Sequence, residues 1–565
     1  MKLQIHGQKQ VPVDETPAAN GAVTVEVKDR VTVTGLRGDA LPVLIDLPPD
    51  HVLELQMEGE GAPRLLLRGD EAQALLAGGA AMTRDGAGDD LLVLPTHLQL
   101  DPPARGRRGL DRGPLAWAVK TVQVLKVDGK PAEAARQLED QNPALGLNRW
   151  LPDGTLEPLA PGTAAEGKTW LLFLHGTASS TLEGFGKLIG AQPAIWRQLH
   201  ATYPGRVLAF DHRTLTEDPI RNATTLLAAL PPNITLHLVS HSRGGLVGEL
   251  LARPQLVAPG TDTVFDPAEV QELAEPDRPS AEALGQALVA SGVRVTRFVR
   301  VACPARGTDL AGGRLDRWLN LLFNLVQQTA APLDIDDAVQ RKVEGLRLLA
   351  LAASAGKDNP DALPGIAAMA PDASPLLAIL NRGPANPAPP QDEAPAQDGL
   401  VVIGGDAEPA GVVKRLLVWL ADALLQGEND LVVETTSVGG GTPRAVAPPL
   451  VLDRGPQVDH SRFFANDRTA QAMLLGLRDP ALLREGSVPS LPEQMREAEA
   501  RLRGTIRSAD AAPFLSRGRG TPLAVILPGI TGSHLAVGKN RVWVSPFGIC
   551  TRGVKSLALG RTQIT

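Results

Sequence analysis

One stretch of the chain places a serine where it can act as a nucleophile. Residues 234–253 read ITLHLVSHSRGGLVGELLAR, in which an apolar strand-like run leads through SHSRG into an apolar helix-like run. This resembles the G-x-S-x-G turn that exposes a catalytic serine between a strand and a helix, with Ser240 in place of the first glycine. Small residues such as Ser240 and Gly244 suit this strained turn, which brings backbones close together. Ser242 is the candidate nucleophile; the simpler interpretation is a Ser/Gly-rich connection.

A serine hydroxyl is a weak nucleophile until a base removes its proton, so a histidine oriented by a carboxylate is required. After this kind of turn, the acid and then the histidine follow the serine along the chain. Only His460 and His534 follow Ser242. His460 lies in VDHSRFFAND, whereas His534 belongs to a later, separate segment. Although a lone histidine is more often structural, order and elimination predict that His460 is the base.

Two aspartates are candidates for the acid. Asp406 directly follows the apolar run LVVIGG, and Asp430 lies in GENDLVVETTSV after a helix-like stretch at 412–425. We favour Asp430, because a turn between the last strands is the commoner setting for this acid. Asp406 is the alternative acid, or it caps the helix that follows it.

The oxyanion of an acyl-transfer intermediate needs two preorganised backbone N–H donors. One is expected from Arg243, the residue after the nucleophile. The other is expected from the loop LHGTASS after an earlier strand-like run, where Gly176 lets the backbone turn inward and the Thr177 N–H is the candidate donor. His175 in the same loop is interpreted as an architectural residue of the oxyanion loop.

These residues need a scaffold, and the surrounding sequence predicts an α/β fold. Nearly continuous apolar runs alternate with helix-like segments, as expected for parallel strands buried on both faces; the runs lie at 170–174, 206–210, 234–239, 295–302 and 400–405. An insertion at 307–399 carries an amphipathic helical pattern that includes Trp318 and Leu322. It is interpreted either as a helical cap over a pocket or as another core helix. Its tail at 384–398 is rich in Pro, Ala and acidic residues and is expected to form a surface loop.

The residues before this region have a different pattern. From about residue 22 to 129, short apolar runs with period-two alternation are separated by Gly, Pro and Asp, which predicts a β-rich domain of sandwich or barrel type. The expected domains are therefore 1–150, 165–480 and a last segment at 481–565. That last segment contains a charged helix-like stretch with Ser490 as its N-cap.

The motifs together resemble the α/β-hydrolase superfamily, of the bacterial lipase and esterase type. The resemblance rests on LHGTASS, VSHSRGG, VACPARGTDLA, LPGIAAMAPDASPLLAILN, ENDLVV and VDHSRFF, which occur in family order over about 168–477. It implies an α/β-hydrolase domain with a mostly parallel sheet, hydrolysis of carboxylic esters through an acyl-enzyme, and no cofactor. The departures are Ser240 and the Pro-rich loop, and the N-terminal β-rich domain lies outside the match.

The segment PGITGSHL at 528–535 resembles the first strand and oxyanion loop of lecithin:cholesterol acyltransferase-like hydrolases. No second serine turn, acid or histidine follows it in this sequence. We interpret the segment as the start of an incomplete second hydrolase-like domain, as expected for a fragment of a longer protein.

Composition excludes several classes of protein. The formal net charge is -7, which argues against nucleic-acid binding because binding to phosphates needs a basic surface. The 2 cysteines lie far apart, and neither H-E-x-x-H nor a Cys/His cluster is present, so we expect no disulfide framework and no metal site. The sequence shows no signal-peptide-like start and no run of about 20 apolar residues, so a cytoplasmic location is expected.

The sequence therefore predicts a serine ester hydrolase that acts on a small-molecule or lipid ester. The cap is also expected to contact a membrane surface. The sequence leaves open whether the acyl group passes to water or to another acceptor. The contrasting hypothesis is an inactive hydrolase-fold module that serves as a binding or scaffold part of a larger protein. The distance between the Ser242 hydroxyl and the His460 ring distinguishes them. A competent site needs about 3 Å, and a separation beyond roughly 6 Å favours the scaffold.

Overall fold

The structure is a computed structural model of the whole chain. It describes residues 2–10, 18–19, 21–34, 42–59, 62–69, 72, 82–84, 90–100, 115–311, 315–330, 337–356, 363–387, 398–408, 414, 417–418, 421, 425, 428–455, 457–483, 536–537 and 540–541. Residues Met1–Ser490 form one compact unit, and Leu491–Thr565 form a second.

Eight strands of the first unit form the sheet that carries the candidate site, in the order β12-β11-β14-β13-β15-β16-β17-β18. Their bounds are β11 (Gly146–Trp150), β12 (Leu156–Pro158), β13 (Thr169–Leu174), β14 (Val207–Asp211), β15 (Thr235–His241), β16 (Arg294–Val301), β17 (Leu400–Ala407) and β18 (Leu450–Gly455). The strands β13 to β18 are paired in parallel, and β11 is antiparallel to both its neighbours. The five predicted apolar runs coincide with β13 to β17, which confirms the α/β organisation.

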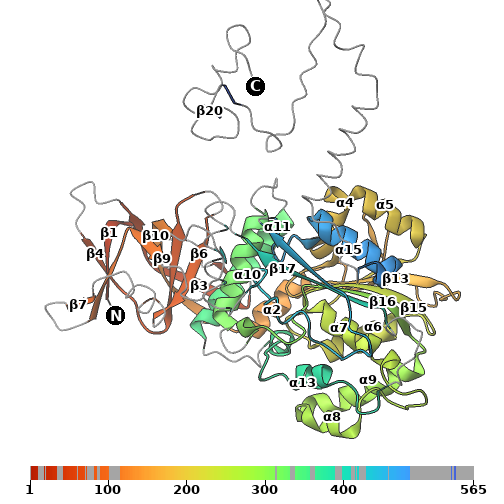
Figure 1. Cartoon of the computed structure of the whole chain (residues 1–565). Helices are drawn as coiled ribbons and strands as arrows, with labels where there is room; N and C mark the ends of the chain where they lie inside the picture. The colour runs from red at the N-terminus through yellow and green to blue at the C-terminus, as the bar shows by residue number, and fades with distance from the viewer. Residues whose placement is uncertain are drawn as a thin grey trace, which may run out of the picture. The chain divides into compact units, whose positions relative to one another are not determined.

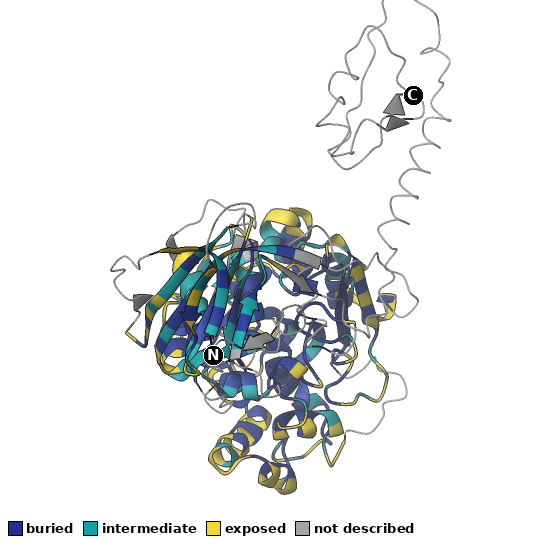
Figure 2. Cartoon of the chain, turned by 90° about the vertical axis from the view of Figure 1, so that its left-hand side faces the viewer, coloured by how far each residue is buried: buried dark blue, intermediate teal, exposed yellow. Residues whose placement is uncertain are grey.

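Alternate side chains of the central strands enter two separate hydrophobic cores. In β13, Trp170, Leu172 and Leu174 belong to one core, whereas Leu171 and Phe173 belong to the other. Successive side chains of a strand point to opposite faces, so a strand buried on both faces must be apolar throughout. In Figure 2 the strands nearest the viewer belong instead to the sheet formed by the N-terminal residues, and buried, intermediate and exposed residues follow one another along them.

Helices cover both faces of this sheet (Figure 1). One face packs against α4 (Lys187–Ala191), α5 (Pro193–Thr202) and α15 (Asp467–Arg478). The other packs against α6 (Pro219–Ala229), α7 (Gly244–Ala252) and α9 (Arg278–Ala290). The described residues of this region also form the short helices α3 (Thr181–Phe185) and α8 (Pro267–Glu272). Because the parallel strands all end at the same edge, the loops that follow them meet there.

The strand pairing differs from the predicted division of the chain at residues 150 and 165. Strand β11 falls in the predicted N-terminal domain, yet it pairs with β14 of the second sheet, and β12 pairs with β11. Sequence alone did not indicate this, because GLNRW at 146–150 lacks an apolar alternation and becomes a strand only against the edge of β14.

The N-terminal residues form a mostly antiparallel, curled sheet in the order β6-β5-β10-β3-β1-β8-β7, with β2, β4 and β9 paired beside this path. The bounds are β1 (Lys2–Gln10), β2 (Ala18–Ala19), β3 (Val23–Val33), β4 (Pro42–Asp46), β5 (His51–Met57), β6 (Arg64–Arg68), β7 (Met82–Arg84), β8 (Asp90–Leu94), β9 (His97–Leu100) and β10 (Leu115–Gly129). Strand β1 changes partner along its length, from β4 to β3. The predicted β-rich character of this region is confirmed.

Helix α2 (Pro131–Asp140) connects the two sheets. The described part of the insertion after β16 contains the α-helices α10 (Leu315–Ala330), α11 (Asp337–Ala355), α12 (Pro364–Ala367) and α13 (Pro375–Arg382). The predicted amphipathic helix is α10. It packs along α11, and α11 packs against α2 and the N-terminal sheet. The insertion therefore contacts the N-terminal sheet as well as the loops that follow β13 to β17.

In the second unit, the structure describes β19 (Ala536–Val537) and β20 (Asn540–Arg541), which pair antiparallel. The segment at 528–535 and the helix expected after Ser490 lie outside the described residues. Among the residues that are described, no helix is both long and apolar enough to cross a membrane.

Candidate active site

Ser242 occupies the turn between β15 and α7, as the sequence predicts. Its φ angle is 53°, a left-handed backbone conformation that is rare for a residue other than glycine. The Ser242 N–H donates to the Val301 carbonyl at the end of the neighbouring strand, over 2.8 Å. Strain of this kind persists only where the surroundings hold it, and here the turn is held by strand β16.

Two glycines allow the backbone to pack tightly around this turn. A Cβ atom on Gly176 would lie 2.6 Å from the Ser242 Cβ, and one on Gly244 would lie 2.3 Å from the Leu174 carbonyl oxygen. A side chain at either position would displace the turn from the end of β13. Ser240, which replaces the usual first glycine, is fully buried, so the turn accommodates its small side chain.

His460 lies between Ser242 and Asp430. Its Nε2 atom is 2.9 Å from the Ser242 Oγ, and its Nδ1 atom is 2.8 Å from the Asp430 Oδ2. The His460 backbone N–H also donates to the Asp430 carbonyl over 2.9 Å. The three side chains come from segments far apart in sequence, and all three are buried. The structure thus brings together the predicted nucleophile, base and favoured acid.

The loop around Asp430 fixes the orientation of its carboxylate. The Oδ1 atom accepts hydrogen bonds from the backbone N–H groups of Val432 and Val433, at 3.1 and 2.8 Å, which leaves Oδ2 to face His460. The alternative acid has a different partner, because the Asp406 carboxylate lies 2.9 Å from the Arg454 Nε. Only Asp430 is hydrogen-bonded to His460 among the aspartates that the structure describes.

The two predicted oxyanion donors belong to the loop after β13 and to the residue that follows Ser242 in the chain. Thr177 lines the same cavity as Ser242, on the loop after β13. The Arg243 side chain points away into the protein, where it donates to the Gly365 carbonyl and the Asn222 Oδ1, at 2.9 and 2.8 Å. Burial lowers the pKa of Arg243 to about 10. Arg243 therefore anchors the turn through its side chain, and its backbone N–H is the group that could serve as the predicted oxyanion donor.

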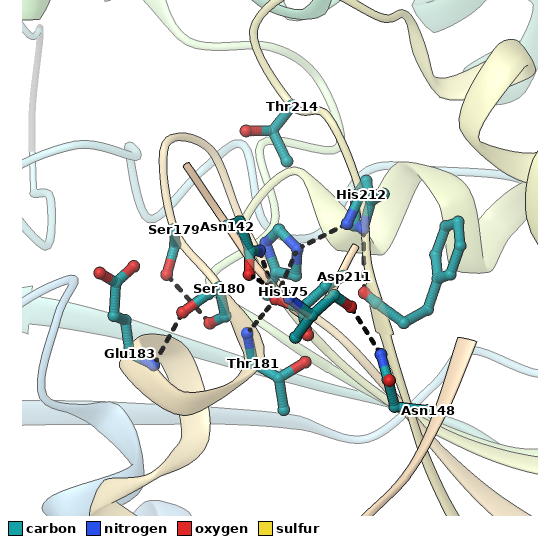
Figure 3. Close-up of polar contacts among 12 residues, drawn as sticks. Asn142, Asn148, His175, Ser179, Ser180, Thr181, Glu183, Asp211, His212 and Thr214 are labelled. Carbon is teal, nitrogen blue, oxygen red and sulfur yellow. Dashed lines mark hydrogen bonds and ion pairs between the residues drawn. The ribbon is translucent and has the colours of Figure 1, made fainter. Parts of the chain in front are cut away.

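His175 is completely buried, and its hydrogen bonds keep the ring in one tautomer. The His175 Nε2 accepts from the backbone N–H of His212 over 3.0 Å, so Nδ1 carries the proton and faces the Gly176 carbonyl over 3.0 Å (Figure 3). Burial lowers the pKa of His175, which favours the neutral ring. These contacts agree with an architectural role in the oxyanion loop.

The space above Ser242 is a small, mainly apolar cavity of about 30 Å³, called here the nucleophile cavity. Its lining includes Trp318 and Leu322 from α10, Met369 from the segment after α12, and Val432 and Val433 from the Asp430 loop. Of the two interpretations of the insertion, the contacts support a cap, because one face of α10 closes this cavity.

Sequence reasoning missed two residues that position the site. The His241 Nε2–H donates to the His460 carbonyl over 2.8 Å, and the Lys187 Nζ donates to the Ser461 carbonyl over 2.7 Å. Both hold the backbone around His460. Burial lowers the pKa of His241 well below its usual value, so the ring is neutral beside His460. The adjacency of His241 to Ser242 was the signal that could have found it, whereas Lys187 has no comparable sequence signal.

Comparison with solved structures finds several hydrolases at low similarity. The mature form of the Bacillus licheniformis lipase BlEst2 is 13% identical, with 57% of this chain and 96% of that chain covered and a TM-score of 0.28. Phospholipase PlaB from Legionella pneumophila is 13% identical, covering 58% and 65%, with a TM-score of 0.33. Lipase 1 from Pelosinus fermentans is 14% identical, covering 52% and 92%, with a TM-score of 0.31.

No curated protein sequence matches the chain. A family model does match, over residues 143–278 and 277–478, a region that contains Ser242, Asp430 and His460. This region is more than half of the 565 residues. The chain therefore belongs to the family described as "Domain of unknown function (DUF7379)".

Proposed function

We propose that the protein is a serine hydrolase that cleaves carboxylic esters through an acyl-enzyme, with an α/β-hydrolase domain capped by the insertion after β16. One observation carries the proposal. Ser242 Oγ, His460 Nε2, His460 Nδ1 and Asp430 Oδ2 form a continuous chain of hydrogen bonds, at 2.9 and 2.8 Å. These distances lie within the range required of a nucleophile and its base.

The protonation states follow from this geometry. The His460 Nδ1–H donates to Asp430, so Nε2 presents a lone pair to the Ser242 hydroxyl. When Ser242 Oγ attacks the ester carbonyl, its proton passes to His460 Nε2, and Asp430 stabilises the imidazolium that forms. His460 then returns this proton to the leaving alcohol as the C–O bond breaks. Water, deprotonated by His460, releases the acid from Ser242 in the same manner.

The negative charge of each tetrahedral intermediate needs donors that are already in position. We propose the backbone N–H groups of Thr177 and Arg243, each contributing roughly 3 kcal/mol to lowering the barrier. The close approach of Gly176 to Ser242 supports this assignment, because it brings the oxyanion loop against the nucleophile. The His175–Gly176 hydrogen bond holds that loop in place.

The nucleophile cavity has space for about two water molecules, given its volume of about 30 Å³. In this conformation it suits an acetyl-sized acyl group. A longer acyl chain, including that of a lipid ester, requires α10 to move away from Ser242.

The test combines a fluorophosphonate probe with hydrolysis of p-nitrophenyl esters. Wild-type protein is expected to be labelled and to hydrolyse the acetate, and Ser242→Ala and His460→Ala are expected to lose both properties. Ser461→Ala is the matched control, because Ser461 neighbours His460 but its hydroxyl donates to Asp459 instead. A folded wild-type protein that is neither labelled nor active would reject the proposal in favour of a module without turnover.

A further inference from the structure

A second cavity, of about 220 Å³, lies behind the oxyanion loop. Its lining includes Leu138, Leu145, Ser179, His212, Thr214 and Val339, from the end of α2, the loop after β13, the loop after β14 and the start of α11. Ser179 lines this cavity and the nucleophile cavity as well. The second cavity therefore adjoins the candidate active site but takes no part in the proposed mechanism.

His212 lines this cavity and carries an unused hydrogen-bond acceptor. Its Nδ1–H donates to the Phe210 carbonyl over 3.1 Å, so Nε2 carries a lone pair. This Nε2 is buried and has no hydrogen-bond partner within the described structure. The residue is 5% exposed, and burial lowers the pKa of His212 well below its usual value, so the ring stays neutral at neutral pH. A buried acceptor of this kind favours a ligand that brings a hydrogen-bond donor.

The remaining polar groups of the cavity add donors without adding net charge. The Thr214 hydroxyl accepts from the Ala178 N–H over 2.8 Å, which leaves its own proton free to donate. The charged lining residues are Glu139, Glu183, Arg341 and Lys342, two of each sign. Glu139 is engaged by the loop after β14, and Glu183 by Lys342. The rest of the lining is mixed: it includes the apolar Leu138, Leu145 and Val339 and the polar Gln141, Asn142, Ser179 and Ser180.

His212 is also connected to the oxyanion loop. Its backbone N–H donates to the His175 Nε2, and the His175 Nδ1–H faces the Gly176 carbonyl, beside Ser242. The two imidazole rings lie with their centroids 4.3 Å apart, and Figure 3 shows the contact between His212 and His175. A ligand held by His212 would therefore lie next to the groups that position the oxyanion donors.

We propose that the second cavity binds a neutral, hydroxyl-bearing group, whose O–H donates to His212 Nε2 and whose oxygen accepts from Thr214. A hydroxyl satisfies both partners at once, whereas a carboxylate or phosphate would face the bare lone pair of His212. Such a group can come from the alcohol part of the ester or from a free diol or polyol. The first of these sources rests on the proposed function.

Kinetics with isosteric acetate esters distinguish the sources. The pairs are n-propyl and 2-hydroxyethyl acetate, n-pentyl and 4-hydroxybutyl acetate, and n-heptyl and 6-hydroxyhexyl acetate, each differing by a terminal CH₃ or OH. If the alcohol part occupies the cavity, one hydroxylated ester is expected to exceed its alkyl partner in kcat/KM by about tenfold, as one net hydrogen bond provides. If a free molecule occupies it, 1,4-butanediol is expected to change the turnover of n-propyl acetate instead.

His212→Phe keeps an aromatic ring and the backbone N–H but removes Nε2, and the hydroxyl preference or the diol effect is expected to disappear. Val339→Trp fills the cavity from α11 and leaves both histidines unsubstituted, and it should have the same effect even if His212→Phe does not fold. His200→Phe is the matched control, because its Nε2 is also buried and unpartnered but lines neither cavity. It should keep the wild-type preference.

The proposal is overturned if the wild-type protein hydrolyses these esters with neither a hydroxyl preference nor a response to the diol, or if both cavity variants retain them. If the wild-type protein hydrolyses no ester, the proposed function is wrong, and binding of the diol then tests the second cavity by itself. In that case 1,4-butanediol should still raise the melting temperature of the wild type and not that of Val339→Trp. No such difference would reject the site as well.

Discussion

At the scale of single residues, hydrogen bonding distinguishes the two candidate acids. Asp430 receives two backbone N–H bonds on one oxygen and faces His460 with the other. Asp406 is also buried, but it forms an ion pair with Arg454. Burial and carboxylate chemistry are therefore common to both positions, and only orientation toward the imidazole differs.

We expect Asp430→Asn to lower kcat by about 10³- to 10⁴-fold, because an amide cannot hold the His460 tautomer or stabilise its charge. Asp406→Asn, the matched control, should change kcat less than about threefold, since it weakens an ion pair with Arg454 and not a contact with His460. Steady-state hydrolysis of p-nitrophenyl acetate measures both variants. Equal losses in the two variants would contradict the assignment of the acid.

Glu434 is a second residue whose shifted pKa leads to a test. Burial, with a smaller contribution from the nearby Asp309 and Asp430 carboxylates, raises the pKa of Glu434 to about 7. Since the folded state holds this proton more tightly than the unfolded chain, the free energy of unfolding falls as the pH rises from about 4.5 to 7 and levels off above 7.

The expected loss attributable to Glu434 is about 3 kcal/mol at most, from the shift in pKa. Urea unfolding at pH 5 and pH 8 should therefore show a smaller loss of stability in Glu434→Gln than in the wild type. An identical pH dependence in the two proteins would show that Glu434 ionises normally.

At the scale of elements, a buried ionic network fixes the helix that follows the nucleophile. Glu249 of α7 pairs with Arg300 of β16 and with Arg444, and Arg444 also pairs with Asp398, which lies just before β17. Arg300 also donates to the Val438 carbonyl over 2.9 Å. These side chains are almost completely buried, so each charge depends on its partners, and α7 cannot shift without breaking several contacts.

Helix α10 determines the size of the nucleophile cavity, which leads to a prediction about acyl length. Trp318→Ala should raise the ratio of kcat/KM for p-nitrophenyl octanoate over acetate by about tenfold or more, because the indole closes the cavity over Ser242. Trp196→Ala is the matched control, because it removes an equally buried indole from the opposite core. Both variants should lose roughly 3–5 kcal/mol of stability, but Trp196→Ala should leave the ratio of kcat/KM values unchanged. An unchanged ratio in Trp318→Ala would contradict the cap's role.

At the scale of the whole molecule, the contacts of the N-terminal sheet suggest a role for it: it holds the insertion in place. The Asn324 side chain of α10 exchanges two hydrogen bonds with the Arg64 backbone of β6, at 2.8 and 2.9 Å. The buried Glu54 of β5 pairs with Arg347 of α11 over 2.7 Å. Because the opposite face of α10 closes the nucleophile cavity, the N-terminal sheet supports the cap from outside.

We expect Glu54→Gln to lower the free energy of unfolding by about 3–5 kcal/mol, because the buried Arg347 would lose its buried charge partner and keep only the more exposed Glu344, 3.0 Å away. Arg347 lowers the pKa of Glu54 despite its burial, so this contribution is present at neutral pH and is lost in acid, as the pH falls through the lowered pKa. The exposed Glu26→Gln, the matched control, should change stability by less than about 0.5 kcal/mol. Chemical denaturation measures both, and similar small effects would show that the pair does not anchor α11.

Several features of this protein could be predicted from local sequence. The apolar runs of β13 to β17, the amphipathic α10 and the strand–turn–helix around Ser242 depend on neighbouring residues, because alternation, helical spacing and small turn residues act over short distances. The order of serine, acid and histidine then selected His460 and favoured Asp430. The structure brings these side chains into contact, while their catalytic roles remain predictions for the experiments above.

Other features were decided only by the tertiary structure. Strand β11 exists because it pairs with β14, β12 because it pairs with β11, and β18 because it pairs with β17. The sequence GLNRW at 146–150 carries no signal for its pairing. The contact of Asp430 with His460 and the unused acceptor of His212 depend on which loops meet at the carboxyl edge of the sheet. Such contacts join segments distant in the chain, so the sequence alone determined which residues were available for chemistry, and packing decided which of them face one another.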